Sequence, residues 1–296
     1  MEAMDKILQD KVAIITGANQ GLGLAITKKY IEAGVRGLTI CARDSVRLQM
    51  ASEQLKSLLG TGQNLLARTA DVSKPQDVKS LVDATKETYG QIDILVNNAG
   101  IYGPMGRIED IDWMEWVKAI EINLFGSIQM CRAVLPHFRA QRHGKIVQLS
   151  GGGATNPLPR LSSYAVSKAA IVRFIETLAE EVRADGIDVN AIAPGALNTR
   201  MLDEALNAGP EKVGQAFYDR SLKQKQNGGA PLEKGAQLAV FLGSKLSDGL
   251  TGRLISAVWD PWPSLPDHLD ELQASDIYTL RRIIPSDRGK DWGNEP

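Results

Sequence analysis

Residues 11–34, KVAIITGANQGLGLAITKKYIEAG, run from an apolar, β-branched stretch through three glycines into a pattern with helical spacing. The stretch predicts a buried strand, a tight turn and a helix. A helix that begins in a glycine-rich turn presents free backbone N–H groups and the positive end of its dipole to an anion. With Leu at position 22 the turn is not a Walker loop. We therefore expect it to bind the pyrophosphate of a dinucleotide, through Gly17, Asn19, Gln20, Gly21, Leu22 and Gly23.

The alternation of strands and helices continues along the chain. Six further strand-like runs follow, namely GLTICA, NLLART, IDILVNN, KIVQLS, IDVNAIAPG and GRLISAV, and most are separated by helix-length segments. This order is typical of βαβ units, and strands that are apolar throughout are typical of a parallel sheet covered on both faces. The chain is therefore predicted to be an α/β protein, with one doubly wound parallel sheet of about seven strands.

Two regions depart from this order. Residues 196–230 form a long polar connection with two helical stretches, and long connections in compact domains are often lids or binding loops. Residues 259–296 form a tail in which Trp259 and Trp262 are expected to anchor the chain through buried rings. We predict one domain over residues 1–258, with a lid at about 196–230, and a C-terminal extension over 259–296 that is not an independent domain.

The composition narrows the partners of the protein. The 296 residues are 43% hydrophobic and 23% charged with a formal net charge of -1, which favours neither nucleic acid nor an anionic membrane surface. No run approaches the roughly 18 apolar residues of a membrane helix, and MEAMDKILQD does not resemble a secretion signal, so a cytoplasmic location is expected. The two cysteines and three histidines are scattered, and no metal site is predicted.

The end of the second strand bears on the choice of cofactor. Dinucleotide folds carry there an acid that binds the ribose hydroxyls of NAD or an arginine that accommodates the extra phosphate of NADP. The run GLTICA ends in Ala42 and Arg43, followed by Asp44. Arg43 favours NADP, with NAD as the alternative. The competing interpretation is that Arg43 is a solvated loop charge paired with Asp44.

Further motifs follow in a fixed order. NNAG at 97–100 closes the fourth strand, and YAVSK places Tyr164 and Lys168 one helical turn apart. Together with TGANQGLG these motifs resemble the classical short-chain dehydrogenase/reductase family over roughly residues 11–258, and the resemblance implies a Rossmann-type fold and a nicotinamide cofactor. It also implies that the following residues contact the cofactor: Asp71, Val72, Asn98, Ala99, Gly100, Tyr164, Lys168, Pro194, Gly195 and Thr199.

Tyr164 and Lys168 carry the predicted chemistry. Hydride transfer between a nicotinamide and a carbonyl or carbinol carbon requires a group that gives or takes the hydroxyl proton. A tyrosine has an ordinary pKa of about 10, so a fixed cation is needed to stabilise its phenolate, and Lys168 lies on the same helix face at i+4. The resemblance implies that Lys168 also holds the nicotinamide ribose and that Asn123 links it to solvent through a water.

One residue departs from the family pattern. The family normally carries a serine thirteen residues before the tyrosine, and position 151 is instead Gly, the first of three glycines at 151–153. Losing one donor to a developing oxyanion costs on the order of 10²- to 10³-fold in rate. The replacement is either Ser150, which we favour, or the backbone N–H groups of the glycines, or Ser162 or Ser163. The alternative is a slow or inactive enzyme.

The glycines also suggest a substrate class. Their missing side chains would widen the pocket beside the nicotinamide, which suits a polyhydroxylated substrate such as a sugar, a nucleotide sugar or a cyclitol. We predict an NADP(H)-dependent oxidoreductase that interconverts a secondary alcohol and a ketone on such a substrate. The alternatives are a carbonyl or 3-oxoacyl reductase of the same family, and a catalytically impaired nucleotide-binding regulator. The resemblance further implies a homodimer or homotetramer.

Overall fold

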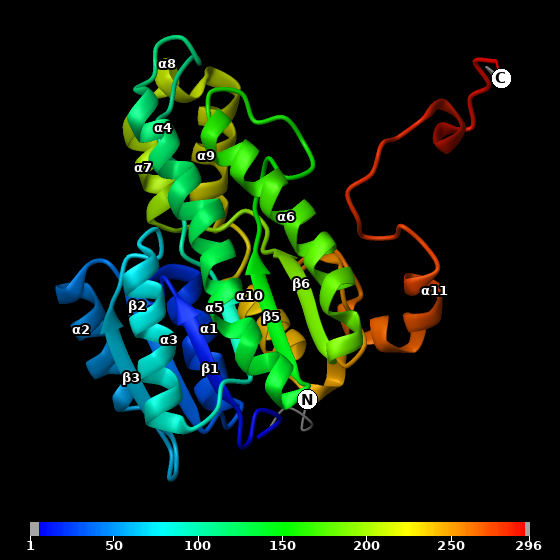
Figure 1. Ribbon diagram of the computed structural model, residues 1–296. Helices are drawn as coiled ribbons and strands as arrows, with labels where there is room; N and C mark the ends of the chain where they lie inside the picture. Colours follow the sequence, from blue (N-terminus) through cyan, green and yellow to red (C-terminus); the bar gives the residue numbers. More distant parts are fainter. Residues whose placement is uncertain (1–5, 294–296) are drawn as a thin grey trace.

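The computed structural model describes residues 6–293 of the chain, so the first five residues of the predicted domain and the last three of the predicted extension lie outside the described residues. A seven-stranded parallel sheet runs through the centre of the molecule, in the order β3-β2-β1-β4-β5-β6-β7 (Figure 1). The predicted α/β fold with about seven parallel strands is confirmed. The strands are β1 (Val12–Thr16), β2 (Gly37–Ala42), β3 (Asn64–Thr69), β4 (Ile94–Asn97), β5 (Gly144–Leu149), β6 (Ile187–Ala193) and β7 (Leu254–Ser256).

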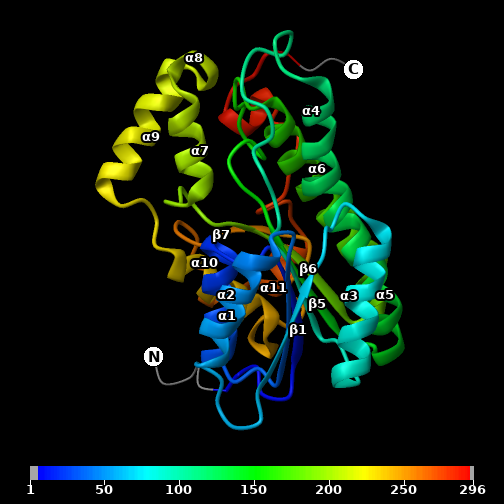
Figure 2. The same cartoon turned by 90° about the vertical axis from the view of Figure 1, so that its left-hand side faces the viewer.

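Helices cover both faces of the sheet, as Figure 2 shows edge-on. One face packs against α1 (Gly21–Glu32), α2 (Ser45–Lys56) and α10 (Leu232–Gly243). The other packs against α3 (Pro75–Tyr89), α5 (Gly126–Gln141) and α6 (Ser162–Val182). The remaining α-helices of the described residues are α4 (Trp113–Ile120), which continues through a π-helical turn at Glu121–Phe125 into α5, and α7 (Arg200–Ala208), α8 (Pro210–Val213), α9 (Gln215–Asn227) and α11 (Leu269–Gln273).

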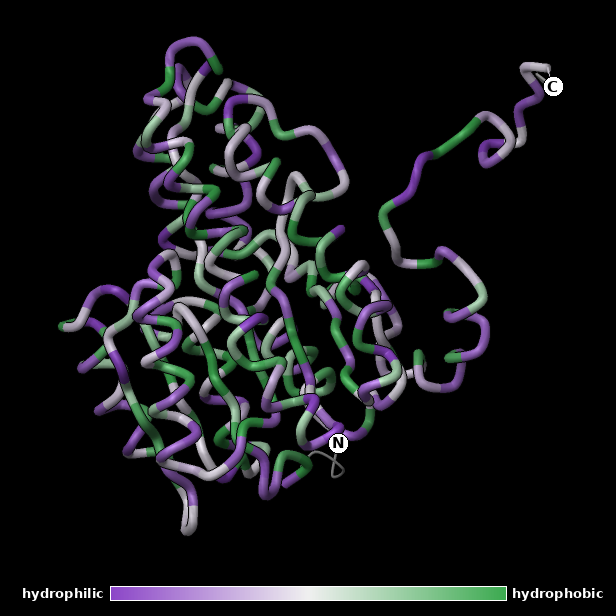
Figure 3. The backbone as a smooth tube through the Cα atoms, in the orientation of Figure 1, coloured by the Kyte–Doolittle hydropathy of each residue, from purple (hydrophilic) through white to green (hydrophobic). Residues whose placement is uncertain are grey.

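The sequence of the central strands explains why they lie inside. All residues of β1, β2, β4 and β5 are buried, and Figure 3 shows mainly hydrophobic colours along the central strands. A parallel sheet with helices on both sides requires apolar side chains on both faces of each strand. The sheet therefore separates two apolar cores and holds the strand ends in fixed positions.

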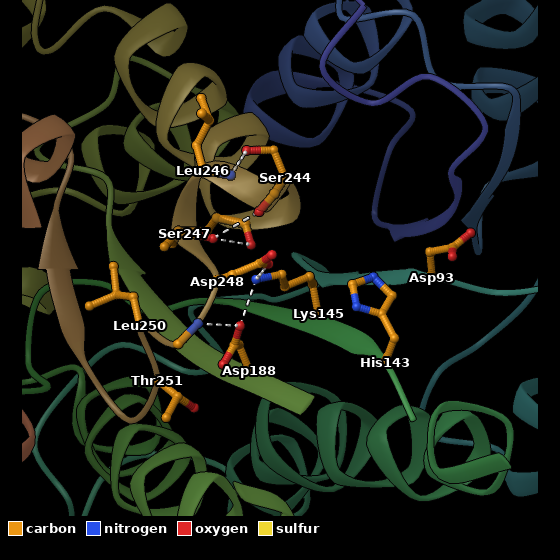
Figure 4. A network of polar contacts seen from close by, with 12 residues as sticks. Asp93, His143, Lys145, Asp188, Ser244, Leu246, Ser247, Asp248, Leu250 and Thr251 are labelled. Atoms are coloured by element: carbon orange, nitrogen blue, oxygen red, sulfur yellow. Dashed lines mark hydrogen bonds and ion pairs between the residues drawn. The ribbon is translucent and has the colours of Figure 1, made fainter. Parts of the chain in front are cut away.

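The amino ends of two strands are tied by an ionic cluster (Figure 4). The Nζ of Lys145, at the start of β5, lies 2.6 Å from a carboxylate oxygen of Asp188 on β6 and 2.7 Å from one of Asp248. The side chain of Lys145 is 2% exposed, so its charge depends on these two partners. The cluster fixes the end of the sheet opposite the glycine turn.

The chain order reverses between β1 and β4, so that the connections after these two strands diverge. In doubly wound sheets, ligands bind in the crevice that forms at the carboxyl ends of the strands at such a reversal. The glycine turn follows β1, and NNAG follows β4. The fold therefore brings both motifs to one edge of the sheet.

The C-terminal tail differs from the prediction in the burial of one of its two tryptophans. Trp262 is half-buried and packs against the core, with its ring 5.2 Å from that of Phe241, but the Trp259 side chain is 81% exposed. The prediction that Trp259 anchors the tail is wrong, because the turn after β7 directs this ring to solvent.

None of the helices within residues 6–293 has the length and apolar character that a membrane crossing requires.

Candidate active site

One cavity of about 1380 Å³ opens at the carboxyl ends of the strands. It reaches from the glycine turn to the Tyr164 region and is bordered by α7 and α9, within the predicted lid. The cavity brings together nearly all predicted site residues: Gly17, Asn19, Gln20, Gly21, Leu22, Gly23, Arg43, Val72, Asn98, Ala99, Gly100, Ser150, Tyr164, Lys168, Pro194, Gly195 and Thr199.

The glycine turn is too crowded for side chains. Gly17 has φ +64°, and a Cβ on it would lie 2.9 Å from the Cα of Ala99, while a Cβ on Gly23 would lie 2.4 Å from the Nδ2 of Asn98. The same Nδ2 donates hydrogen bonds to the carbonyl oxygens of Thr16 (2.9 Å) and Gly17 (3.0 Å). Asn98 therefore fixes the turn from the neighbouring strand.

The start of α1 faces this turn without a side-chain cap. Backbone N–H groups in the first turn of a helix have no intrahelical acceptor, and they bind phosphate when a glycine turn exposes them. A cradle that only glycine can form, in front of an uncapped helix, fits the pyrophosphate of a dinucleotide.

Arg43 directly follows β2, lines the same cavity as the glycine turn and makes no ion pair with the described residues. The carboxylate of Asp44 caps α2 by accepting from the backbone N–H of Arg47 (3.0 Å), and it also pairs with the Arg47 guanidinium at 3.3 Å. The predicted pairing of Arg43 with Asp44 is therefore wrong, because Asp44 caps α2 and pairs with Arg47, whereas the exposed position of Arg43 agrees with a solvated charge. The guanidinium of Arg47 donates a longer hydrogen bond of 3.4 Å to Gln20, across the mouth of the glycine turn.

Two predicted site residues do not line the cavity. The carboxylate of Asp71 accepts hydrogen bonds from the backbone and hydroxyl of Ser73, and its neighbour Val72 lines the cavity instead. Asn123 is fully buried, accepts from the N–H of Ile101 (2.8 Å) and donates to its carbonyl (2.8 Å) and to Ser167 (3.0 Å). Asn123 thus holds the segment after β4 against α6 rather than contacting the cavity.

Tyr164 and Lys168 lie side by side on α6, and both are buried. The Nζ of Lys168 lies 5.6 Å from the centre of the Tyr164 ring and donates to the carbonyl of Leu149 (2.9 Å). The ring of Tyr164 packs edge-on against Tyr102, with 4.8 Å between the ring centres. Leu149 is the last residue of β5, so the lysine is positioned by both the helix and the sheet.

Burial shifts the proton affinities of this pair in opposite directions. Desolvation, and to a lesser extent Tyr102, raise the pKa of Tyr164 above its ordinary value of 10.0, so the hydroxyl is neutral at physiological pH. Desolvation lowers the pKa of Lys168 from 10.5 to about 8. The lysine is therefore still a cation at neutral pH, beside a tyrosine that carries its proton.

Gly151 and Gly152 differ in what surrounds them. A Cβ on Gly151 would lie 2.2 Å from the hydroxyl oxygen of Tyr164, whereas a Cβ on Gly152 would meet no atom within 4 Å. The expectation that the glycines widen the pocket is therefore wrong for Gly151, and also for Gly153, where a Cβ would lie 2.8 Å from the Cα of Ala165, while the space beside Gly152 is open. The Tyr164 hydroxyl fills the space that a side chain at position 151 would need.

The candidate replacements for the missing serine also differ. Ser162 accepts a hydrogen bond from the indole N–H of Trp116 (3.0 Å), and Ser163 donates to the carbonyl of Tyr102 (3.2 Å), so both hydroxyls have structural partners. The Ser150 hydroxyl is shielded from solvent and has no hydrogen-bond partner among residues 6–293. Its backbone is fixed by the hydrogen bond from its N–H to the carbonyl of Ile192 (2.8 Å).

Sequence reasoning did not identify several residues of the cavity wall. Tyr102 stands two residues after NNAG, and no pattern in the sequence indicated that it would touch Tyr164. The wall also contains Leu158, Met201, Phe217 and Gln224, and Arg220, within the predicted lid, stands over the Phe217 ring at 6.0 Å. Within residues 6–293 no three His, Cys, Asp or Glu side chains lie close enough to hold a metal ion.

Comparison of the sequence and of the structure with known proteins finds similar dehydrogenases and reductases in both cases. The short chain dehydrogenase family matches residues 11–209. The chain is 36% identical over 248 residues to 3beta-hydroxysteroid dehydrogenase 1 of Eggerthella lenta, covering 83% of this chain and 91% of that protein. The crystal structure of levodione reductase has a TM-score of 0.77 at 28% identity, over 84% of this chain and 96% of that one. NAD+-bound xylitol dehydrogenase has a TM-score of 0.73 at 25% identity, over 84% and 98%.

Proposed function

Because this chain belongs to the short-chain dehydrogenase/reductase family, whose members are oxidoreductases that act on CH–OH and C=O groups, we propose that it uses NADP(H) to interconvert a secondary alcohol and a ketone on a bulky, polyhydroxylated substrate. The observation that carries the proposal is the single cavity that contains the glycine turn, Arg43 and the Tyr164–Lys168 pair. A cofactor held by the turn and by Lys168 would supply or accept the hydride in that cavity.

Tyr164 handles the proton. Its hydroxyl is neutral at physiological pH and has no hydrogen-bond partner among the described residues, so it can donate to a substrate carbonyl oxygen. Lys168 provides a cation beside the ring, which stabilises the phenolate left after donation. Asn123 is a positioning residue, because it connects the segment after β4 with Ser167, which precedes Lys168 on α6.

Ser150 takes the place of the family's serine. Leaving a buried hydroxyl without a partner costs about 1–3 kcal/mol, so the orphaned oxygen of Ser150 requires an explanation. It adjoins Gly151 and belongs to the wall of the same cavity as Tyr164. In this structure the hydroxyl is shielded, and a rotation of the Ser150 side chain toward the cavity would make a substrate oxygen bound beside Tyr164 its missing partner.

Arg43 supports NADP over NAD. Arg43 is exposed, has no ion-pair partner among residues 6–293 and directly follows β2, the position at which dinucleotide folds carry the residue that contacts the adenosine ribose. The extra phosphate of NADP would give it a charge-assisted, bidentate partner.

The polar side chains of the lid and the open space beside Gly152 support a polyhydroxylated substrate. Arg220, Gln224 and Asn227 line the cavity from α9, where they can bind hydroxyl groups. A second candidate, a bulky alicyclic ketone, is favoured by the apolar wall at Leu158 and Phe217 and by the identity to a hydroxysteroid dehydrogenase.

The test is a substrate panel followed by the absorbance of the reduced nicotinamide. Cyclitols and sugar nucleotides, alicyclic ketones and alcohols, and acyl thioesters are each offered with NADPH or NADP and with NADH or NAD, and Tyr164→Phe controls for background. Turnover confined to acyl thioesters or simple ketones contradicts the proposed substrate class. Cofactor binding without turnover on any substrate favours the nucleotide-binding regulator.

Ser150 is tested on the substrate that the panel identifies. Ser150→Ala is expected to lower kcat by on the order of 10²- to 10³-fold, because a donor to the developing oxyanion is lost. Ser150→Thr keeps the hydroxyl and Ser162→Ala removes a hydroxyl with a structural partner, so both should retain most of the activity. An unchanged kcat in Ser150→Ala assigns the donor role to the backbone N–H groups of the glycine segment instead.

A further inference from the structure

The end of the chain is anchored to the body as far as Leu280. The N–H of Leu254 on β7 donates to the carbonyl of Tyr278 (2.8 Å), and the N–H of Leu280 donates to the Glu176 carboxylate on α6 (2.6 Å). Arg253, which is buried, donates to the carbonyls of Ser275 and Ile277 (3.1 and 2.8 Å). The direction in which the chain leaves the body at Leu280 is therefore fixed.

Residues 281–293, here named the arm, then leave the body. Their hydrogen bonds run within the tail itself, and none within residues 6–293 joins the arm to the sheet or to its covering helices. The arm nevertheless exposes large apolar side chains, with Ile283 at 58% and Trp292 at 77%. It contains four basic and two acidic residues, so its net charge is positive.

A second exposed surface has the opposite charge. Residues 107–115, here named the acidic face, form the turn before α4 and its first helical residues, and they contain four acidic residues and one basic residue. Ile108, Trp113 and Met114 are 61%, 62% and 70% exposed on it. Exposed apolar side chains that gather within charged residues are typical of an interaction site.

The arm and the acidic face of one chain are not neighbours. Figure 1 shows the arm on one side of α6 and α4 on the other, with the arm pointing away from the body. An arm of 13 residues spans at most roughly 45 Å when extended. It is therefore long enough to cross onto another molecule.

We propose that the arm of one copy of this chain docks on the acidic face of a second copy, and that the exchange is reciprocal. Arg288 and Lys290 would meet Glu109 and Asp110, none of which has an ion-pair partner among the described residues, and the exposed apolar side chains of the two segments would cover each other. A two-fold axis makes both contacts equivalent, as in most homodimers.

The docking surface connects with the candidate active site. The Trp113 ring stacks on that of Trp116 at 5.1 Å, and the indole N–H of Trp116 donates to Ser162, the first residue of α6, two positions before Tyr164. An arm seated on Trp113 would stabilise the start of the helix that carries the proton-handling tyrosine.

The experiment uses charge reversal on either surface of the full chain. Arg288→Glu/Lys290→Glu reverses the arm, and Glu109→Lys/Asp110→Lys reverses the acidic face. Lys56→Glu/Lys74→Glu, on α2 and at the start of α3, is a control with the same charge change as the arm variant. Sedimentation velocity and light scattering give the dissociation constant of the assembly, and circular dichroism verifies folding. Each reversed variant is expected to associate about tenfold more weakly than the unmodified chain and the control, because two ion pairs are replaced by repulsion.

Mixing the two reversed variants provides the decisive measurement. Both contacts of the mixed dimer pair opposite charges again, so an equimolar mixture is expected to regain the lost affinity and to weaken as salt is raised. Two outcomes overturn the proposal: reversed variants that associate as tightly as the unmodified chain, and a mixture that associates no more tightly than its components. Deletion of residues 281–296 should reproduce the loss and tests the same contact without introducing new charges.

Discussion

Gly151→Ser restores the hydroxyl residue that the family normally carries thirteen positions before its tyrosine, yet we expect it to remove most of the activity. A Cβ at this position would lie 2.2 Å from the hydroxyl oxygen and 3.2 Å from the Cζ of Tyr164. Contacts below 3.0 Å require one partner to move. The substitution therefore competes with the tyrosine for one space.

The tyrosine has little freedom to move aside. It is buried, its ring packs edge-on against Tyr102, and its backbone belongs to α6. Relief of the overlap requires a displacement of the hydroxyl on the order of 1 Å, and a misplacement of this size can lower a rate by about 10²-fold. The corresponding loss of transition-state stabilisation is about 2.7 kcal/mol.

The assay compares kcat/KM for the substrate identified by the panel, together with cofactor affinity measured by fluorescence titration. Gly152→Ser is the matched control, since its Cβ would meet no atom within 4 Å. We expect Gly151→Ser to bind the cofactor and to lose turnover, while Gly152→Ser retains turnover on small substrates.

Full or increased activity in Gly151→Ser would refute this reasoning. It would mean that the tyrosine adjusts without cost and that the serine position is free. Equal losses in Gly151→Ser and Gly152→Ser would instead show that the loop, and not the Tyr164 hydroxyl, responds to added side chains.

Four further outcomes follow from the same structure. Arg43→Ala should weaken NADPH binding by about 10- to 100-fold and leave NADH binding nearly unchanged in fluorescence titrations, because a charge-assisted contact is lost. Lys168→Met should abolish turnover but raise the free energy of unfolding in urea at pH 7 by on the order of 3 kcal/mol. Burial lowers the pKa of this lysine to about 8 in the folded protein, so keeping it charged below that pH costs stability. The gain should vanish as the pH approaches the pKa of a lysine in the unfolded chain, about 10.4. Carbonyl reduction by Tyr164 should be constant below about pH 8 and fall above it as Lys168 loses its proton, and a flat profile to pH 10 would contradict this role. Asp188→Asn should lower the free energy of unfolding by about 3 kcal/mol, since the buried Lys145 charge loses a partner, and an unchanged urea midpoint would count against a structural role of the cluster.

Much of the fold could be predicted from the pattern of apolar and polar residues in short stretches of sequence. The β-branched runs and the helical segments between them predicted the seven parallel strands, because a parallel sheet covered on both faces requires mainly apolar strands. The exposure of the Trp259 side chain could not be predicted in this way. An aromatic residue has a large area to bury, but whether a turn directs it inward depends on backbone geometry that short patterns do not specify.

The candidate site was predictable where a residue type has one strong physical reason for its place. The turn at Gly17 and Gly23 is crowded by the next strand, so a side chain there would collide with backbone or with Asn98. Tyr164 and Lys168 were predictable because i,i+4 spacing places two side chains on one helix face. Tyr102 escaped prediction because its contact with Tyr164 joins segments that are distant in sequence.

By itself the sequence determined the family, the order in which the functional motifs follow the strands along the chain, and the absence of a serine at position 151. Each of these depends on residue identity and short-range spacing. Only the tertiary structure decided what that absence means. The Tyr164 hydroxyl occupies the space at Gly151, Ser162 and Ser163 are bonded elsewhere, and Ser150 retains a buried hydroxyl without a partner. These are relations of volume and hydrogen bonding between β5, α4 and α6, and such relations exist only after the elements have packed.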